Sequence, residues 1–422
     1  MKLYSFPEKR IWKILFGAYL FALLLLARNG MVSCVLLGFY KAQILMLLVI
    51  GAGVLTFAIV NRRELKHIFL DRRMLAAAAC ALLILLPMAV KRDWQLMYFS
   101  ILIYLLFAVF LTYFVSTKDV AKYYTVILCA LSLYAVLATY VLRLLPDSGI
   151  LSVSMFTNDK GREFYNFGLA FVSVTEVKER NFGIFREPGV YQYFLLLGLF
   201  LTNYAVEWKH SRNMWLANLI LAVTMVTTMA TGGVVCLGLF AVVLFFDKKL
   251  YRDKRILWIA IGLAAALTVV LAVSFAMRNR IYWFVYNTLF EKFVNRTDSV
   301  TERTEAILVD LQIFLRHPIF GARLADVLHA VANNTTSTMI LYAVFGFVSG
   351  SFHVLAWIAL VWKKERRLWA NLALLVILFM GFNTQNLTGD VFFWLFPMMA
   401  LVERGLPLLK KSDNNKLRSE LS

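Results

Sequence analysis

The chain has 422 residues, of which 61% are hydrophobic and 16% charged, and its formal net charge is +19. One soluble core cannot hide this much apolar surface, so the composition excludes a soluble globular protein and indicates an integral membrane protein. In a soluble protein the positive charge would suggest nucleic acid. Here membrane topology accounts for nearly all of it, so we expect no nucleic-acid partner.

Apolar windows of about 17 to 25 residues have the length needed to cross the hydrocarbon layer. The sequence predicts an all-α bundle of about twelve such spans, near 11–27, 31–60, 74–90, 96–115, 124–145, 188–206, 214–230, 233–246, 256–277, 339–362, 368–382 and 391–401. The first window has no small-residue cleavage site after it, and similar windows follow. We therefore expect it to be a span and not a removed signal peptide.

Lys and Arg are concentrated in one alternating set of loops, "NRRELKHIFLDRR", "DKKLYRDKR" and "KKERR", and in the tail 404–422. The opposite short loops, "RNG", "KRDWQ", "TGG" and "NTQNLTGD", contain only three basic residues. The positive-inside rule therefore predicts that both termini are cytoplasmic. Contact of the basic loops with anionic lipid headgroups follows from the same arrangement.

Two long polar segments, 146–187 and 278–338, fall on the predicted outer face of what we interpret as a single transmembrane domain, 1–422. The second lies between the ninth and tenth spans. Long loops without a periodic pattern are usually functional or disordered, so candidate chemistry is expected in these two.

The second outer segment contains a predicted amphipathic helix in "SVTERTEAILVDLQIFLRHP". Ser299 and Glu302 have capping-box spacing, and Pro318 ends the pattern. Arg303 and Arg316 lie near its two ends, and we expect the helix to lie over the outer mouth of the bundle. The residues that share its apolar face are Ile307, Leu308, Leu311, Phe314 and Leu315.

The two outer segments contain many more Arg than Lys. The Lys residues are Lys160, Lys178 and Lys292, and the Arg residues are Arg162, Arg180, Arg186, Arg278, Arg280, Arg296, Arg303, Arg316 and Arg323. A planar guanidinium can bind phosphate through two parallel hydrogen bonds, whereas an ammonium acts as a point charge. The excess of Arg indicates a phosphate-bearing ligand. The alternative is that these side chains pair with neighbouring carboxylates.

The stretch "NFGIFREPGVYQ" places charged residues at the start of an apolar span. Pro188 suits the first turn of a helix, whose free N–H groups favour an anion. Arg180 and Arg186 would add positive charge there, and Glu187 could orient an Arg or receive a proton. Gly189 would permit close approach. The alternative is an ordinary capped helix with an Arg–Glu pair at the membrane interface.

Three motifs together resemble the O-antigen ligase and polysaccharide polymerase superfamily. They are "RNFGIFREPGVYQYFLLLGL", "RTEAILVDLQIFLRHPIFGARL" and the Thr/Ser-Gly turn in "TMATGGVV", in the family's order. The resemblance covers roughly residues 180–350. It implies a bacterial cytoplasmic-membrane enzyme that transfers a glycan from undecaprenyl diphosphate on the outer face, with no metal or other cofactor.

The resemblance also implies roles for individual residues. Arg180, Arg186 and Arg303 would hold the diphosphate, and Arg186 would also act in catalysis. The general base would be Glu187 or His329. Additional substrate-binding residues in the long loop would be Arg316, Asn333 and Asn334. The sequence departs from the family at two places: "NNTT" stands where a His-Asn pair is usual, and "TGG" lacks an Arg that many members carry.

The leading hypothesis is a polymerase that joins lipid-linked repeat units of an O-antigen, capsule or exopolysaccharide. It could work with a chain-length regulator. A ligase that moves the finished glycan to a terminal acceptor uses the same chemistry and remains open. A flippase for the lipid-linked oligosaccharide would place charges along a path within the spans, where this sequence has few. A structural membrane protein would leave the Arg bias unexplained.

Overall fold

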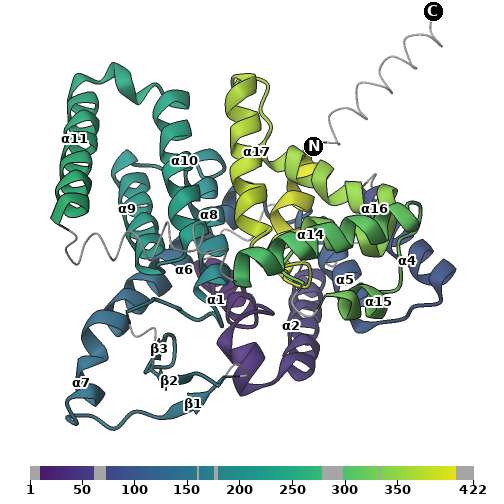
Figure 1. The fold of residues 1–422 in the computed structure, drawn as a ribbon. Helices are drawn as coiled ribbons and strands as arrows, with labels where there is room; N and C mark the ends of the chain where they lie inside the picture. The colour runs from purple at the N-terminus through teal and green to yellow at the C-terminus, as the bar shows by residue number, and fades with distance from the viewer. Residues whose placement is uncertain are drawn as a thin grey trace, which may run out of the picture.

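The computed structural model describes residues 10–60, 73–158, 161–174, 179–277, 298–331 and 334–404. Its fold is mostly helical, and each apolar window of the sequence coincides with a helix (Figure 1). These helices are α1 (Arg10–Leu25), α2 (Phe39–Val60), α4 (Arg73–Lys91), α5 (Leu96–Leu111), α6 (Thr117–Leu137), α8 (Pro188–Tyr204), α9 (Ser211–Thr227), α10 (Thr231–Asp247), α11 (Lys254–Met277), α16 (Thr338–Val361), α17 (Leu368–Phe382) and a last helix at 391–404.

Within the described part of the chain, four helices are long and apolar enough to cross a membrane, judged by length and composition. They are Phe39–Val60, Arg73–Lys91, Thr117–Asp147 and Thr338–Val361. The third is α6 continued through a π-helical turn, Ala138–Leu142, into the short helix α7 (Leu144–Asp147). Several of the remaining apolar helices are shorter, among them α5, α10 and α17.

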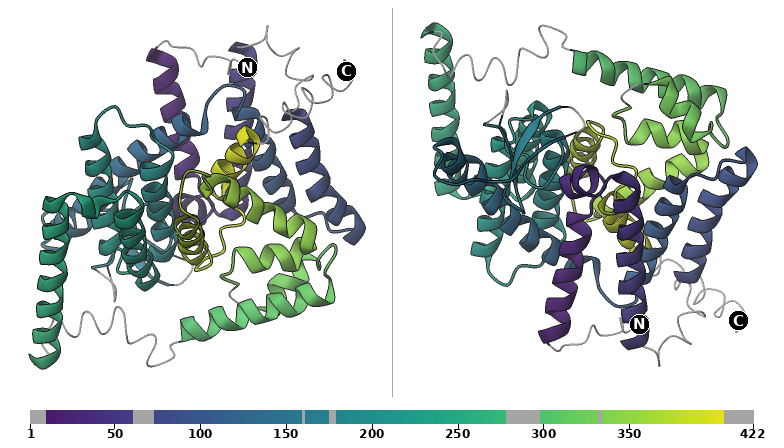
Figure 2. Two further views of the ribbon diagram at one scale, coloured as in Figure 1. Left: turned by 90° about the horizontal axis from the view of Figure 1, so that it is seen from above. Right: turned by 90° about the horizontal axis from the view of Figure 1, so that it is seen from below.

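Helix α8 lies at the centre of the molecule. Every residue of it except Gly189 is buried, because α6, α9, α10 and α17 pack around it. The helix at 391–404 lies near the middle as well, and its Phe392, Phe393 and Phe396 are fully buried (Figures 1 and 2). In contrast, α11 stands at the edge of the bundle (Figures 1 and 2).

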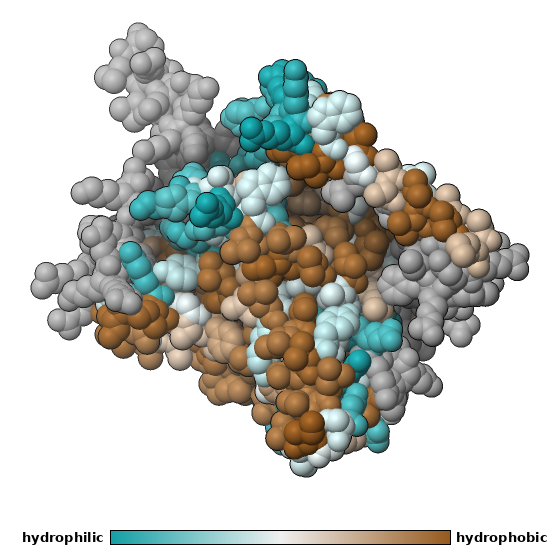
Figure 3. Space-filling model, turned by 90° about the vertical axis from the view of Figure 1, so that its left-hand side faces the viewer, coloured by the Kyte–Doolittle hydropathy of each residue, from teal (hydrophilic) through white to brown (hydrophobic). Residues whose placement is uncertain are grey.

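The outer surface has the polarity that the sequence predicts for a helical bundle in an apolar medium. Figure 3 shows the side on which α9, α10 and α11 lie, where hydrophobic residues cover the middle. Most of the hydrophilic residues visible there gather toward the upper end, where a 3-10 turn (Leu250–Arg252) connects α10 and α11.

The first long polar segment contains a small antiparallel sheet that the sequence patterns do not predict. Strand β1 (Met155–Thr157) pairs with β2 (Glu163–Asn166), and β2 pairs with β3 (Phe171–Ser173). A separate small core holds the sheet against the bundle. It consists of Met31, Phe164, Phe171 and Phe182.

The predicted amphipathic helix is present as α14 (Asp298–Arg316) and ends directly before His317 and Pro318. It packs on α16, but Ala306 and Asp310 are its fully buried residues. Ile307, Leu308 and Leu315 are exposed. Most of the apolar face therefore points away from the bundle, although Phe314 is half-buried and its ring lies 5.5 Å from that of Tyr342. The more deeply buried face is the one that contains Asp310.

Helix α16 is broken at Gly346, where φ is +74°. The chain segment after α14 pairs with this break: Ala322 N donates to Ala343 O at 2.8 Å, and Phe347 N donates to Pro318 O at 2.7 Å. The Lys91 ammonium, at the end of α4, binds Val344 O and, at 3.0 Å, Ala322 O. The polar groups freed by the break are thus bound by partners from two other segments.

Candidate active site

The predicted active-site stretch runs from Arg180 into α8, between two other loops. Asn181 N donates to Thr227 O at 2.9 Å, which fixes the stretch to the end of α9. Arg186 N donates to Asn29 O at 2.9 Å, which fixes it to the loop after α1. Gly183 has a φ of +57° and faces the ring of Tyr191 too closely for a side chain.

The side chain of Arg180 binds two backbone carbonyl groups and so helps to hold the fold together here. Its Nε and Nη2 donate to Thr228 O and Met229 O, each at 3.2 Å. These carbonyls lie in the turn "TMATGG" between α9 and α10. Burial, and then the charge of Arg162, lower the pKa of Arg180. Two of the predicted motifs are therefore joined directly by this side chain.

Arg186 and Glu187 lie together at the N-terminus of α8. Arg186 Nη2 is 3.4 Å from Glu187 Oε1, and both side chains are about four-fifths buried. Gln385 Nε2 donates to Glu187 Oε2 at 3.1 Å, and the guanidinium of Arg186 lies 5.9 Å from the ring centre of Phe39. The carboxylate is thus held from two sides at a helix N-terminus, which is the arrangement needed to fix its orientation.

Gln192, one turn further into α8, connects the same helix to the Thr-Gly-Gly turn. Its Nε2 donates to Thr384 Oγ1 at 2.9 Å. A Cβ on Gly233 would lie 2.8 Å from Gln192 Oε1, and one on Gly232 would lie 3.3 Å from Gln192 Nε2. Both glycines are therefore required for close packing of α10 on α8 at this end.

The loop at 383–390, "NTQNLTGD", is fixed to the start of α16. Asn383 Oδ1 accepts from Thr338 N at 2.7 Å and from Ser337 N at 3.1 Å. Ser337 Oγ, fully buried, accepts from Leu387 N at 3.0 Å and lies 2.6 Å from Gln385 O. Because Gln385 binds Glu187, this network positions the partner of the candidate base.

A second buried network joins α14 to the same region. Thr336 Oγ1 donates to Asp310 Oδ2 at 2.6 Å, and Asn334 Nδ2 donates to Asp310 Oδ1 at 2.8 Å. Burial raises the pKa of Asp310, and the two hydrogen bonds oppose that rise. The "NNTT" segment, which stands where the family has a His-Asn pair, thus binds a carboxylate of the amphipathic helix.

Arg28, which is half-buried, and Asp390, which is fully buried, lie close to Arg186. Arg28 interacts electrostatically with both, and its guanidinium lies against the backbone of Gly389, where a Cβ would clash with it. Burial raises the pKa of Asp390 to about 7, although the charge of Arg28 opposes that rise. Asp390 Oδ1 also accepts from Phe392 N at 2.9 Å, at the start of the last helix.

The remaining predicted residues lie apart from this cluster or outside the described part of the chain. Arg303 is half-buried on α14, and Arg316 is exposed at its end. His329 is exposed near the end of the short helix α15 (Leu324–Ala330). Asn334 binds Asp310, and Asn333 lies outside the described residues.

The structure brings together Arg180, Arg186 and Glu187 and adds three residues to which the sequence patterns give no role: Arg28, Gln385 and Asp390. Arg28 and Asp390 are charged residues in short loops on the predicted outer face, and their charge is the sequence feature that could have indicated a role for them. Among the residues the structure describes, no group of three or more His, Cys, Asp or Glu could hold a metal ion.

Comparison with known proteins gives no match to this chain among family models, curated proteins or solved structures.

Proposed function

We propose that this chain is an integral membrane protein with about twelve spans and both termini in the cytoplasm. The correspondence of helices to apolar windows supports the spans, and the basic loops support the orientation. The exposed apolar face of α14 is suited to the interface between the outer leaflet and water. The bilayer belongs to the bacterial cytoplasmic membrane if the family resemblance holds.

We propose further that the protein is a polysaccharide polymerase that transfers a growing glycan from undecaprenyl diphosphate to the next lipid-linked repeat unit. The observation that carries this proposal is the cluster of Arg186, Glu187 and Gln385 at the N-terminus of α8. The Thr-Gly-Gly turn is held against the same end of the helix. Two of the three segments that resemble the family's motifs, though distant in the chain, thus lie together at one predicted outer site.

In the proposed reaction, a hydroxyl of the acceptor sugar attacks the anomeric carbon of the donor glycan. The bond between that carbon and the diphosphate oxygen breaks, and undecaprenyl diphosphate leaves with the electron pair. Arg186 and the free N–H groups of α8 would stabilise the charge that develops on the phosphate oxygens. Glu187, oriented by Gln385, would take the proton of the acceptor hydroxyl.

The test is reconstitution of the purified protein in lipid vesicles with an undecaprenyl-diphosphate-linked repeat unit as the only substrate. Polymer length is then read on a gel. We expect a ladder for the wild type and a loss of about 100-fold in rate for Arg186→Ala. Arg212→Ala is the matched control, because Arg212 is exposed at the opposite, predicted cytoplasmic end. Both variants must keep the wild-type melting temperature.

Failure of the ladder with active, folded protein would contradict the polymerase proposal. Transfer to an added lipid A-core acceptor under the same conditions would then identify a ligase of the same chemistry. A ladder that persists unchanged in Arg186→Ala would retain the polymerase and contradict the placement of the diphosphate at Arg186.

A further inference from the structure

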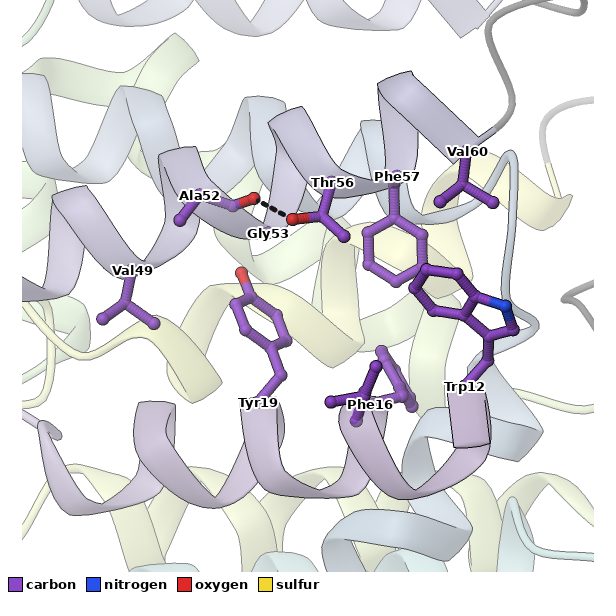
Figure 4. Close-up of a pocket in the computed structure, with 10 residues that line it drawn as sticks. Trp12, Phe16, Tyr19, Val49, Ala52, Gly53, Thr56, Phe57 and Val60 are labelled. Carbon is purple, nitrogen blue, oxygen red and sulfur yellow. Dashed lines mark hydrogen bonds between the residues drawn. The ribbon is translucent and has the colours of Figure 1, made fainter. Parts of the chain in front are cut away.

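Helices α1 and α2 run antiparallel and enclose an apolar groove with a volume of about 280 Å³ (Figure 4). Trp12, Phe16 and Tyr19 enter it from α1, and Phe57 enters it from α2 (Figure 4). The groove lies in the half of the helices nearer to the predicted cytoplasmic face. Its volume is close to the lower end of the range of about 300–1,000 Å³ that is usual for ligand sites.

Small residues on α2 make room for the groove. Gly53 faces Tyr19, whose ring is so close that a Cβ on Gly53 would lie 2.5 Å from it. Ala52 and Thr56 lie on the same side of α2, and the hydroxyl of Thr56 donates to Ala52 O at 2.8 Å (Figure 4). The hydroxyl of Thr56 is therefore already satisfied, whereas the buried hydroxyl of Tyr19, on the opposite wall, has no hydrogen-bond partner among the described residues. The rest of the lining is almost entirely apolar, so the groove suits a hydrocarbon chain.

The surroundings of the groove are apolar too. Leu48, Leu55 and Ile59, on the other faces of α2, are about three-fifths exposed. In the proposed membrane setting those faces contact lipid chains, and the groove opens beside them. A lipid chain can therefore enter it without crossing water.

A second, small hollow continues the same seam toward the predicted outer face. Arg28, Phe39, Gln43 and Met46 are among the residues that line it. One turn of α2 separates Met46 from Val49, which lines the apolar groove. Arg186 lies over the ring of Phe39 at the outer end. The seam thus has Arg28 and Arg186 at one end and a hydrocarbon-lined groove at the other. Asp390 and Glu187 lie beside the two Arg side chains.

The length of this seam fits a membrane lipid with an anionic headgroup. From Trp12 to Leu25 the helix α1 rises by roughly 20 Å, at about 1.5 Å per residue, and Arg28 follows three residues later. This rise is most of the thickness of about 30 Å of the hydrocarbon layer. A phosphate at Arg28 and Arg186 would place the attached chain against the seam.

We infer that the α1–α2 seam binds the isoprenoid tail of a polyprenyl-diphosphate-linked substrate, with its diphosphate at Arg28 and Arg186. This inference rests on the proposed function. The two Arg side chains at the outer end, and the position of the groove along the same pair of helices that leads to them, favour this occupant. Four aromatic side chains line the groove and match the methyl-branched, unsaturated surface of an isoprenoid chain.

The experiment uses the full-length protein in vesicles and an undecaprenyl diphosphate that carries a photoreactive diazirine in its tail. After irradiation, the labelled peptides are mapped by mass spectrometry. We expect label on α1 and α2 that unlabelled undecaprenyl diphosphate removes and that an equal amount of phosphatidylglycerol does not. Ala52→Trp, which fills the groove, should lower the labelling of these helices about 10-fold.

The matched control is Gly51→Trp, because Gly51 is exposed and a Cβ at this position would meet no atom within 4 Å. This control should label as the wild type does. Three results would overturn the inference. Phosphatidylglycerol could compete as strongly as undecaprenyl diphosphate, or Ala52→Trp could be labelled as much as the control. The third is label that is found only on helices other than α1 and α2. If undecaprenyl diphosphate competes nowhere on the protein, the proposed function fails together with the inference.

Discussion

The protonation of Asp390 makes a prediction about stability that does not depend on the proposed reaction. This side chain is fully buried, and burial raises its pKa from 3.8 to about 7. In the unfolded chain the carboxyl group releases its proton near pH 4. Between about pH 4 and pH 7 the folded protein therefore binds one more proton than the unfolded chain does.

The sign of the effect follows from this difference. A carboxyl group with a raised pKa in the folded state contributes its full stability at low pH, and that contribution is lost as the pH rises through the folded pKa. One pH unit corresponds to about 1.4 kcal/mol, so the interval from 3.8 to about 7 amounts to roughly 4 kcal/mol. Between pH 5 and pH 7 the contribution of Asp390 to the free energy of unfolding should fall by about 2–3 kcal/mol.

The measurement is thermal unfolding of the purified protein in detergent between pH 5 and pH 8, followed by tryptophan fluorescence. Asp390→Asn should remove the part of the pH dependence that comes from this group, because the amide remains neutral. Asp253→Asn is the control: its carboxylate is exposed, and Oδ1 binds Arg255 N, a bond that the amide can keep. The difference between the wild-type and Asp390→Asn profiles isolates the contribution of Asp390, so a slope in Asp390→Asn equal to that of the wild type would refute the reasoning.

Three further predictions concern particular contacts. Gly233→Ala should lower the melting temperature and the polymerisation rate, because the added Cβ would contact Gln192. The control is Gly238→Ala, whose Cβ would have no atom within 4 Å. In thermal unfolding this control should be neutral or stabilising by up to about 1 kcal/mol. Lys91→Met should lower the free energy of unfolding by about 2–4 kcal/mol, because the hydrogen bonds to Val344 O and Ala322 O are lost. Lys364→Met, at an exposed position, is the control and should leave the stability unchanged. Equal melting temperatures of the two variants would contradict this prediction. Glu187→Gln should lower polymerisation about 100-fold with little change in substrate labelling, and a loss of labelling instead would indicate a binding role.

The positions of the helices could be predicted from the sequence because hydrophobic windows of this length have one stable solution in an apolar medium. The helix that starts at Phe39 shows the limit of this argument. The window 31–60 predicts one span, but the structure has a π-helical turn at Val32–Leu36 and then Gly38 at a φ of +79° before α2 begins. The window stays apolar throughout, so composition does not show where the helix starts.

The small sheet escaped prediction because its strands have only three or four residues. So short a segment gives no detectable alternation. Its stability comes from contacts with distant residues: Phe164 and Phe171 pack with Met31, which precedes them by more than a hundred positions. Local patterns do not contain that information.

The packing of α14 shows the same limit for a well-predicted helix. The capping spacing and the apolar stripe predicted its existence, and Pro318 predicted its end. The stripe does not show which face packs, and the face that is most buried contains Asp310. That carboxylate is tolerated inside because Thr336 and Asn334 bind it, and these partners come from a segment that follows the helix.

The candidate site was partly predictable for a related reason. Arg186 and Glu187 stand beside Pro188 in one short stretch, so their meeting at a helix N-terminus is a local property. Arg28 and Asp390 are more than three hundred and fifty positions apart, and the positive-inside rule counts Arg28 only as a charge on the outer face. Once the helices are packed, the same charge interacts with Asp390 and lies near Arg186. A charge in a short loop of a membrane protein can thus affect both the orientation of the chain and the chemistry of a site. Only the packing of the helices shows whether the charge lies at a site.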